Sequence, residues 1–141
     1  VDNTEIYIGG SWKFISLKYF HAVSDYFSVP HTSGSGYIDL SANYDLGGGW
    51  GINGHVGHLN FENYSNGRSN GDYTDWKLGV TKDISGWVFG AAYVGTNAKG
   101  SCTPNAAGLT QPYCFGNDAP GATGTKNAGR DTLIVSVSRT F

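Results

Sequence analysis

The sequence has few charged residues and no long apolar segment. Only 14% of its 141 residues are charged, against about 25% in an average soluble domain. No apolar run approaches the roughly 18–20 residues that a transmembrane helix needs. The net charge of −2 provides no basic surface of the kind that binds nucleic acid. These shortages argue against a membrane-spanning helix and against nucleic-acid binding, and they leave too few charges for an ordinary soluble surface.

Helical periodicity is also missing, and apolar residues instead recur at every second position. This alternation is typical of β-strands with one apolar face. Glycine is abundant, with 22 residues, and aromatic residues make up 14% of the chain. The pattern predicts an all-β protein with seven strands in a single domain over residues 1–141. The expected strands are 5–13, 14–27, 36–46, 50–61, 73–84, 86–95 and 130–141.

The links between these strands alternate between short and long. The first, third and fifth links are tight turns, whereas the others run through polar segments rich in glycine, asparagine and serine. An antiparallel up-and-down sheet with all its long loops at one end is the layout of an outer-membrane β-barrel. A soluble sandwich tends to mix loop lengths at both ends, so the links favour a transmembrane β-barrel.

Aromatic residues are concentrated near the ends of the predicted strands. The expected girdle at the short-turn end comprises Trp12, Tyr44, Trp50, Trp87 and Phe141, and the one at the long-loop end comprises Tyr26, Phe27, Phe61, Tyr64, Tyr73 and Tyr93. Two such girdles flanking an aliphatic band suit a wall that faces lipid. Ordinary aromatic packing in a core is the alternative. Arg139 falls on the same apolar side, where its long stem can snorkel to the interface.

The sequence resembles the TorF-type family of proteobacterial porins. The resemblance is carried by SLKYFHAVSDYF, by YTDWKLGVTKDISGWVFGAAYVGTN, by the two loop cysteines and by DTLIVSVSRTF. It implies an outer-membrane barrel of about twelve strands, of which this chain would be the C-terminal part, without the N-terminal strands. The final Phe141 is similar to the C-terminal signal that the barrel-assembly machinery reads.

The polar face of the predicted strands would line the barrel lumen. We expect the pore lining to include Lys18, Asp39, His55, Asp75 and Lys77. Asp75 and Lys77 share a face and are close enough for a charge pair. Such a set can select solutes by charge, or it can pair off as a structural plug of a narrow barrel.

Two cysteines lie in the last long link. The spacing of Cys102 and Cys114 in a polar loop favours a disulfide and an oxidising compartment, with free thiols as the alternative. Closing a loop of this size would contribute about 3 kcal/mol in the chain-entropy model.

No motif points to catalysis or to a metal. His55 and His58 are three residues apart, so on a strand they point to opposite faces and do not form a metal pair.

The sequence therefore predicts a porin-like β-barrel in the outer membrane of a Gram-negative bacterium, passing small hydrophilic solutes or ions by passive diffusion. We expect no enzyme activity and no cofactor. The expected partners are membrane lipid, lipopolysaccharide, the barrel-assembly machinery and small solutes, and a homo-oligomer is left open. Two alternatives are a closed structural or adhesive barrel that acts through its loops, and a soluble secreted β-sandwich that binds carbohydrate through Trp76 and Trp87.

Overall fold

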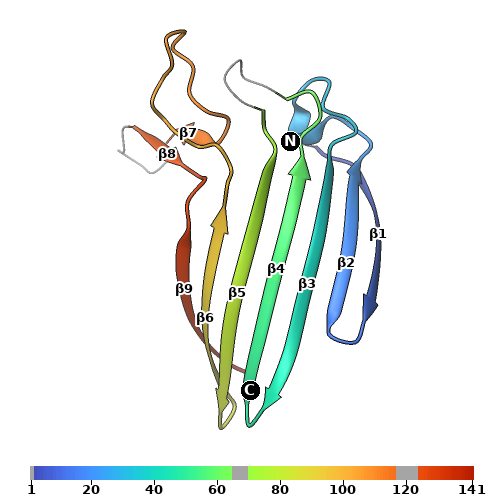
Figure 1. Cartoon of the computed structure of the whole chain (residues 1–141), viewed down its shortest axis with the longest axis vertical. Coiled ribbons are helices and arrows are strands. Elements are labelled where there is room, and N and C mark those ends of the chain that lie inside the picture. The colour runs from blue at the N-terminus through green and yellow to red at the C-terminus, as the bar shows by residue number, and fades with distance from the viewer. Residues whose placement is uncertain (1, 65–69, 117–123) are drawn as a thin grey trace.

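The computed structural model describes residues 2–64, 70–116 and 124–141. Its main element is a seven-stranded antiparallel sheet in the order β1-β2-β3-β4-β5-β6-β9 (Figure 1). The strands are β1 (Glu5–Trp12), β2 (Ile15–Ala22), β3 (Gly36–Gly47), β4 (Trp50–Asn60), β5 (Tyr73–Ile84), β6 (Trp87–Thr96) and β9 (Thr132–Arg139). A short 3-10 helix, η1 (Tyr26–Ser28), follows β2, and a two-stranded hairpin of β7 (Cys114–Gly116) and β8 (Thr125–Asn127) precedes β9.

The seven predicted strands and their antiparallel order are confirmed. The strand predicted over 73–84 has the same bounds in β5, and the others differ by a few residues at their ends. The largest difference lies after Ala22, where the expected strand through residue 27 gives way to η1. The strand stops there because the chain turns back on itself. The Gly34 amide donates to the Ala22 carbonyl, and the Ala22 amide donates to the Ser35 carbonyl.

The alternation of link lengths is also confirmed. Figure 1 shows the three tight turns together at one end of the sheet, the short-turn end, and the long links at the other, the long-loop end. At the β3–β4 turn, Gly47, Gly48 and Gly49 have φ values of 81°, 62° and 81°. Glycine adopts this left-handed backbone without a steric penalty, which is why the run of glycines marks the turn.

The sheet is not closed into a barrel. β1 pairs with β2 and β9 pairs with β6, and within the described residues neither outer strand has a second neighbour. The structure therefore confirms an all-β chain with a seven-stranded antiparallel sheet, and this sheet is open where a closed barrel was predicted.

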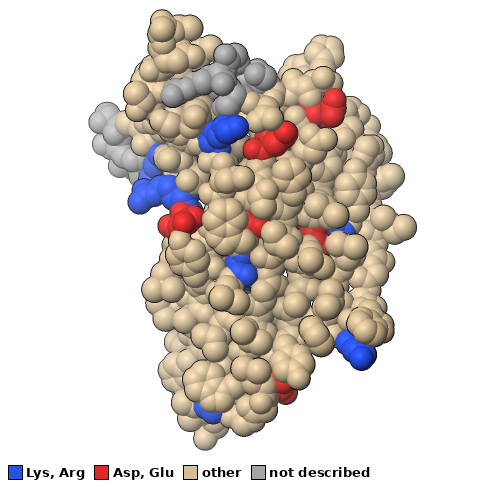
Figure 2. All heavy atoms as spheres, viewed as in Figure 1, with Lys and Arg blue, Asp and Glu red and all other residues tan. Residues whose placement is uncertain are grey.

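The strand register assigns each residue to one of two faces, because directly opposed side chains project to the same side. The face that carries Leu40, Val80 and Phe89 is called the apolar face, and the face that carries Asp39, His55 and Asp75 is called the polar face. On the side of the molecule that Figure 2 shows, most of the surface between the two ends of the sheet is formed by uncharged residues.

No layer of described residues covers the apolar face. Leu40, Val80 and Phe89, on β3, β5 and β6, are 43%, 40% and 48% exposed. Among the described residues the only buried hydrophobic side chains are Ala22 and Leu59. A soluble sandwich would bury this face against a second sheet, and the structure has no such packing here. Among these residues the structure also has no helix of the length and apolarity that a membrane span requires.

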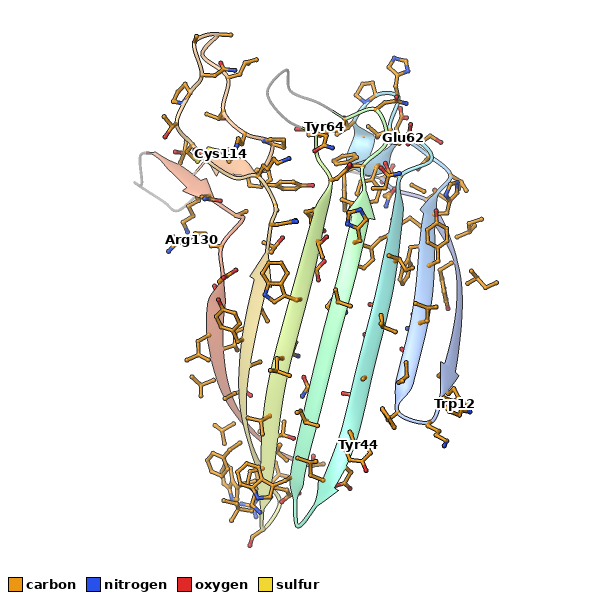
Figure 3. The ribbon with its side chains drawn as sticks, viewed as in Figure 1. Trp12, Tyr44, Glu62, Tyr64, Cys114 and Arg130 are labelled. Carbon is orange, nitrogen blue, oxygen red and sulfur yellow. A yellow bond between two sulfur atoms is a disulfide. The ribbon has the colours of Figure 1, made fainter. Side chains whose placement is uncertain are left out.

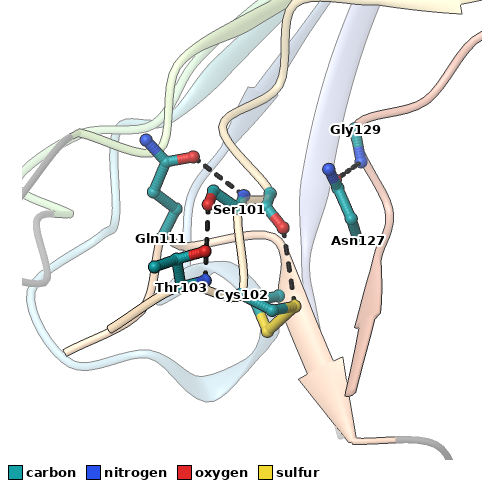
Figure 4. The surroundings of a disulfide bond; sticks show 8 residues. Ser101, Cys102, Thr103, Gln111, Asn127 and Gly129 are labelled. Carbon is teal, nitrogen blue, oxygen red and sulfur yellow. Dashed lines mark hydrogen bonds between the residues drawn. A yellow bond between two sulfur atoms is a disulfide. The ribbon is translucent and has the colours of Figure 1, made fainter. Parts of the chain in front are cut away.

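The predicted disulfide is confirmed. Cys102 and Cys114 are bonded to each other within the long link between β6 and β9 (Figure 4). Around the bond, the Ser101 amide donates to Gln111 Oε1 at 2.8 Å and the Gly129 amide donates to Asn127 Oδ1 at 2.8 Å. The covalent bond and these hydrogen bonds join residues within the long link and so fix its own conformation.

The link between β2 and β3 is held by two buried hydroxyl groups, Thr32 and Ser35. The Tyr26 amide donates to Thr32 Oγ1 at 2.8 Å, and Thr32 Oγ1 donates to the Val29 carbonyl at 2.6 Å. Ser35 Oγ accepts from the Glu62 amide at 3.0 Å, which ties this link to the one between β4 and β5. The two long links are therefore fixed to each other by hydrogen bonds between backbone and side chain, of which Asn63 Nδ2 to the His31 carbonyl is a second.

Candidate functional site: a polar network across three strands

The polar face brings together three of the five predicted pore-lining residues. Asp39, His55 and Asp75 lie on the adjacent strands β3, β4 and β5. Gly57 stands directly between Asp39 and Asp75 in the strand register. Because Gly57 has no side chain, the space between the two carboxylates stays open to the ring of His55 and to Tyr37.

The imidazole ring of His55 lies between the two carboxylates. Its Nε2 is 2.6 Å from Asp75 Oδ1 and its Nδ1 is 3.3 Å from Asp39 Oδ1. Each ring nitrogen therefore faces a carboxylate oxygen, which can accept the proton of whichever nitrogen carries one. The three side chains are 22% to 27% exposed, and water therefore screens these charge pairs.

Two hydroxyl groups complete the network. Tyr37 donates from its hydroxyl to Asp75 Oδ2 at 2.9 Å, and Ser41 donates from Oγ to Asp39 Oδ1 at 2.6 Å. The same hydroxyls lie 3.1 Å and 3.3 Å from the two ring nitrogens of His55. Each carboxylate thus has one neutral donor and one imidazole nitrogen as partners, which fixes the orientation of all five side chains.

The two predicted lysines lie on the same face but outside this network. Lys18 is opposite Asp39 in the register and Lys77 is opposite His55. Within the part of the chain that the structure describes, both ion pairs involve His55, so the expected pair of Asp75 with Lys77 does not form. Asp75 has its carboxylate turned to the imidazole and to the Tyr37 hydroxyl instead.

Tyr37 and Ser41 were not among the residues predicted from the sequence. Their spacing in the sequence could have identified them, because Tyr37 precedes Asp39 by two residues and Ser41 follows it by two, so all three share one face of the strand. Their side chains reach the network because His55 and Asp75 stand on the two neighbouring strands.

The polar face is also hollowed at the short-turn end. An open hollow of about 580 Å³ lies there, lined by Asn43, Asp45, Asn53, Thr81 and Asp83 among others. Tyr44, Trp50, Ile52 and Val88 line it as well, so its wall is a mixture of polar and apolar side chains.

His58 lies on the apolar face, where its Nδ1 is 2.9 Å from Thr74 Oγ1. The prediction that His55 and His58 face opposite sides is confirmed. In residues 2–64, 70–116 and 124–141 there is no group of three His, Cys, Asp or Glu side chains arranged to hold a metal.

Phe141 follows β9 and is fully exposed. The Arg139 guanidinium carbon lies 5.2 Å from the centre of its ring and 5.0 Å from the centre of the Trp87 ring. The expected position of Arg139 on the apolar side is confirmed, because it is opposite Trp87 in the register.

The predicted aromatic residues at the short-turn end lie on the apolar face, and of those predicted at the long-loop end Tyr93 does too. Trp12, Tyr44, Trp50 and Trp87 lie on the apolar face near the short-turn end, as predicted. At the long-loop end the prediction is wrong for most of its members: Tyr73 belongs to the polar face, and its ring lines a cavity together with those of Tyr26, Phe27, Phe61 and Tyr64. Figure 3 shows Trp12 and Tyr44 at the short-turn end and Tyr64 among the loops at the opposite end.

These features define the class of protein: an antiparallel β protein with an exposed apolar face and a polar face that carries an ionisable network. The whole chain, residues 1–141, matches the model of a family described as bacterial protein of unknown function (Gcw_chp), and the chain belongs to that family. No match was found among curated proteins or among solved structures. Membership of the TorF-type porins stays a prediction.

Removing the Tyr37 hydroxyl tests the network directly. We expect Tyr37→Phe to lower the free energy of unfolding by about 1 kcal/mol, because Asp75 loses a hydrogen bond that is partly exposed to water. Chemical denaturation of the folded protein measures this change. Tyr44→Phe is the matched control, because it makes the same change on the apolar face. Equal stability of Tyr37→Phe and Tyr44→Phe would contradict a structural role for the network.

Proposed function

We propose that this chain forms part of the wall of an outer-membrane β-barrel through which small hydrophilic solutes pass by passive diffusion. The observation that carries the proposal is the apolar face, which is exposed along the whole sheet. Exposing this many aliphatic and aromatic side chains to water is unfavourable, at a free energy of about 25 cal/mol for each Å² of apolar surface. Hydrocarbon contact removes that cost.

Cations beside the aromatic rings at the short-turn end support an interfacial position. The Nζ atom of Lys13 lies 4.6 Å from the Trp12 ring centre, and that of Lys82 lies 4.9 Å from the Trp50 ring centre. Together with Arg139 and Trp87, these make three such pairs at one end of the sheet. Tryptophan rings and long cationic side chains are the residues that settle at the headgroup level of a bilayer, where the anionic groups of lipid and lipopolysaccharide would meet them.

The polar face supplies the lining of the proposed aqueous path. Asp39, His55 and Asp75 would present a fixed arrangement of charges to a passing solute, with Lys18 and Lys77 beside them on the same face. A lining of this kind discriminates by charge and size and needs no cofactor.

The proposed wall needs further strands. In hydrocarbon the unpaired backbone groups along β1 and β9 must find partners. Because the seven strands alternate in direction, β1 and β9 run the same way. Closing the ring with antiparallel neighbours on both sides therefore takes an odd number of additional strands.

The carbohydrate-binding sandwich is the weaker candidate. Trp76 and Trp87 are exposed, as it requires, but they stand on a face that carries many other exposed apolar side chains. A sandwich needs a second sheet to cover such a face.

The four tryptophans provide the test, because all of them lie on the apolar face. We expect their fluorescence to be quenched strongly when the folded protein is placed in vesicles of brominated phosphatidylcholine, compared with unbrominated vesicles. A protein that is monomeric in plain buffer, with emission that brominated lipid leaves unchanged, would refute the membrane position. Planar-bilayer recordings test transport separately, since quenched tryptophans without ion conductance would leave a membrane wall and remove the pore.

A further inference from the structure

A cavity of about 330 Å³ lies at the long-loop end, over the polar face of the sheet. Leu59 and Tyr73, which are opposite each other on β4 and β5, contribute to its lining from the sheet. Leu59 is only 3% exposed and is one of the two buried hydrophobic residues in the described chain. The volume is at the lower end of the range for small-molecule sites, roughly 300–1,000 Å³.

Aromatic rings from two separate parts of the chain form the walls. On one side the ring centres of Tyr26 and Phe61 are 5.3 Å apart, edge to face, and those of Phe61 and Tyr64 are 4.5 Å apart and stacked. On the other side Tyr113 stands edge to face with Tyr73 at 5.4 Å. These are the favoured arrangements of aromatic pairs, so each wall holds its own rings in place.

The second wall is anchored to the rest of the molecule. The Tyr113 hydroxyl donates to the Gly71 carbonyl, which lies just before β5. The next residue, Cys114, is bonded to Cys102, and the Ala128 amide donates to the Tyr113 carbonyl at 3.0 Å. The cavity is therefore built before any ligand arrives, which reduces the entropy that binding costs.

The chemistry of the lining is nearly uniform. It consists of aromatic rings, aliphatic side chains and one proline, with no charged or amide side chain. Its polar side-chain atoms are tyrosine hydroxyls. Burial, and then the charges of Glu5 and Tyr73, raise the pKa of Tyr26, and burial raises the pKa of Tyr113. These hydroxyls therefore stay neutral, as weak hydrogen-bonding groups, at physiological pH.

Such a lining suits one kind of ligand. A sugar carries many hydroxyls, and most of them would lose their water here without gaining a partner. An ion would lose its hydration without a countercharge. A flat apolar ring packs well against edges and faces of other rings, and the tyrosines of the lining, Tyr26, Tyr64, Tyr73 and Tyr113, are the residues that could offer a hydroxyl to a single hydroxyl on that ring.

We propose that this cavity binds one small aromatic molecule that carries a hydroxyl group, the chemical class of the phenols. The site adjoins the polar network, because Tyr73 precedes Asp75 by two residues on the same face of β5. A solute that moves along this face therefore meets the aromatic cavity beside the charged groups. The binding site stands on the described residues alone and does not require the barrel to be closed.

Calorimetric titration of the full chain, folded in detergent micelles, tests the proposal with p-cresol as the probe. Toluene keeps the ring and removes the hydroxyl, and glucose keeps hydroxyls and removes the aromatic ring. We expect saturable binding of one p-cresol, weaker binding of toluene by about twofold to tenfold, the range for one neutral hydrogen bond, and no binding of glucose. Equal binding of toluene would overturn the hydroxyl recognition, and tighter binding of glucose would overturn the ligand class.

Three variants distinguish p-cresol binding in the cavity from partition of p-cresol into the micelle. Leu59→Trp places a large side chain in the cavity, and we expect p-cresol binding to be lost. Ile52→Trp is the control on the apolar face of the same strand, and we expect unchanged binding. Tyr73→Phe keeps the ring and the fold, and it should weaken p-cresol binding by about twofold to tenfold while leaving toluene unchanged. Binding that both Leu59→Trp and Tyr73→Phe leave unchanged would refute the site, whereas the tryptophan quenching described above would be unaffected by that result.

Discussion

Placing an arginine at Leu78 should destabilise the protein in a bilayer by about 2–4 kcal/mol, the cost of a cation near the membrane midplane of a β-barrel. Leu78 is in the middle of β5, on the apolar face, and is 62% exposed. If hydrocarbon contacts this face, the guanidinium group must lose water or pull it into the bilayer. Denaturant titration of the protein folded into phosphatidylcholine vesicles measures the difference from the parent chain.

Asn53→Arg is the matched control for this variant. Asn53 faces Gly79 on β5, the residue after Leu78, so the two substitutions lie at nearly the same height on opposite faces of the sheet. The polar face already carries Lys77 on the other side of Leu78. We expect Asn53→Arg to change stability little. A similar loss in both variants would show that the two faces meet the same medium, and the proposed membrane wall would then be wrong.

The strands and their faces were predictable because they depend on local rules. Alternation with period two assigns a face to each residue, and the register adds only which residues are neighbours. The tight turns were visible as well, since the glycine run from Gly47 to Gly49 supplies the positive φ values that they need. The polar position of Asp39, His55 and Asp75 follows from the same rules.

The network itself was not predictable in its contacts. Its central interaction, between His55 and Asp75, joins residues 20 positions apart whose strands must first be aligned. A slip of one residue in that register would turn every side chain of one strand to the other face. The expected pair of Asp75 with Lys77 does not form because the Asp75 carboxylate is engaged by the His55 imidazole and the Tyr37 hydroxyl, which reach it across the open position of Gly57.

The long links were the least predictable part. Tyr26, Phe61 and Tyr64 were expected on a girdle facing lipid, but they lie in loop segments where alternation has no meaning. Their positions are set by contacts between loops, such as the bond from the Glu62 amide to Ser35 Oγ. The hairpin of β7 and β8 was missed because each strand has only three residues, too few to show a period.

Replacing Gly57 with valine should destabilise the protein by about 1–3 kcal/mol, the usual cost of forcing a side chain into occupied space. A Cβ atom at position 57 would collide with the hydroxyl and ring of Tyr37. The ring would have to move, and its hydrogen bond to Asp75 would be lost with it. Denaturant or thermal unfolding in the same vesicles measures the loss of stability.

Gly54→Val, three residues earlier on β4, is the control for this steric argument. Among the described residues, a Cβ at position 54 would meet only the Lys77 carbonyl, at 3.8 Å, an ordinary contact. Valine has a higher β-strand propensity than glycine. Gly54 also lies on the apolar face, opposite Leu78. We expect this variant to be as stable as the parent or more stable. If Gly57→Val behaved in the same way, the space between the two carboxylates would not be filled by Tyr37, and the network would need a different arrangement of its side chains.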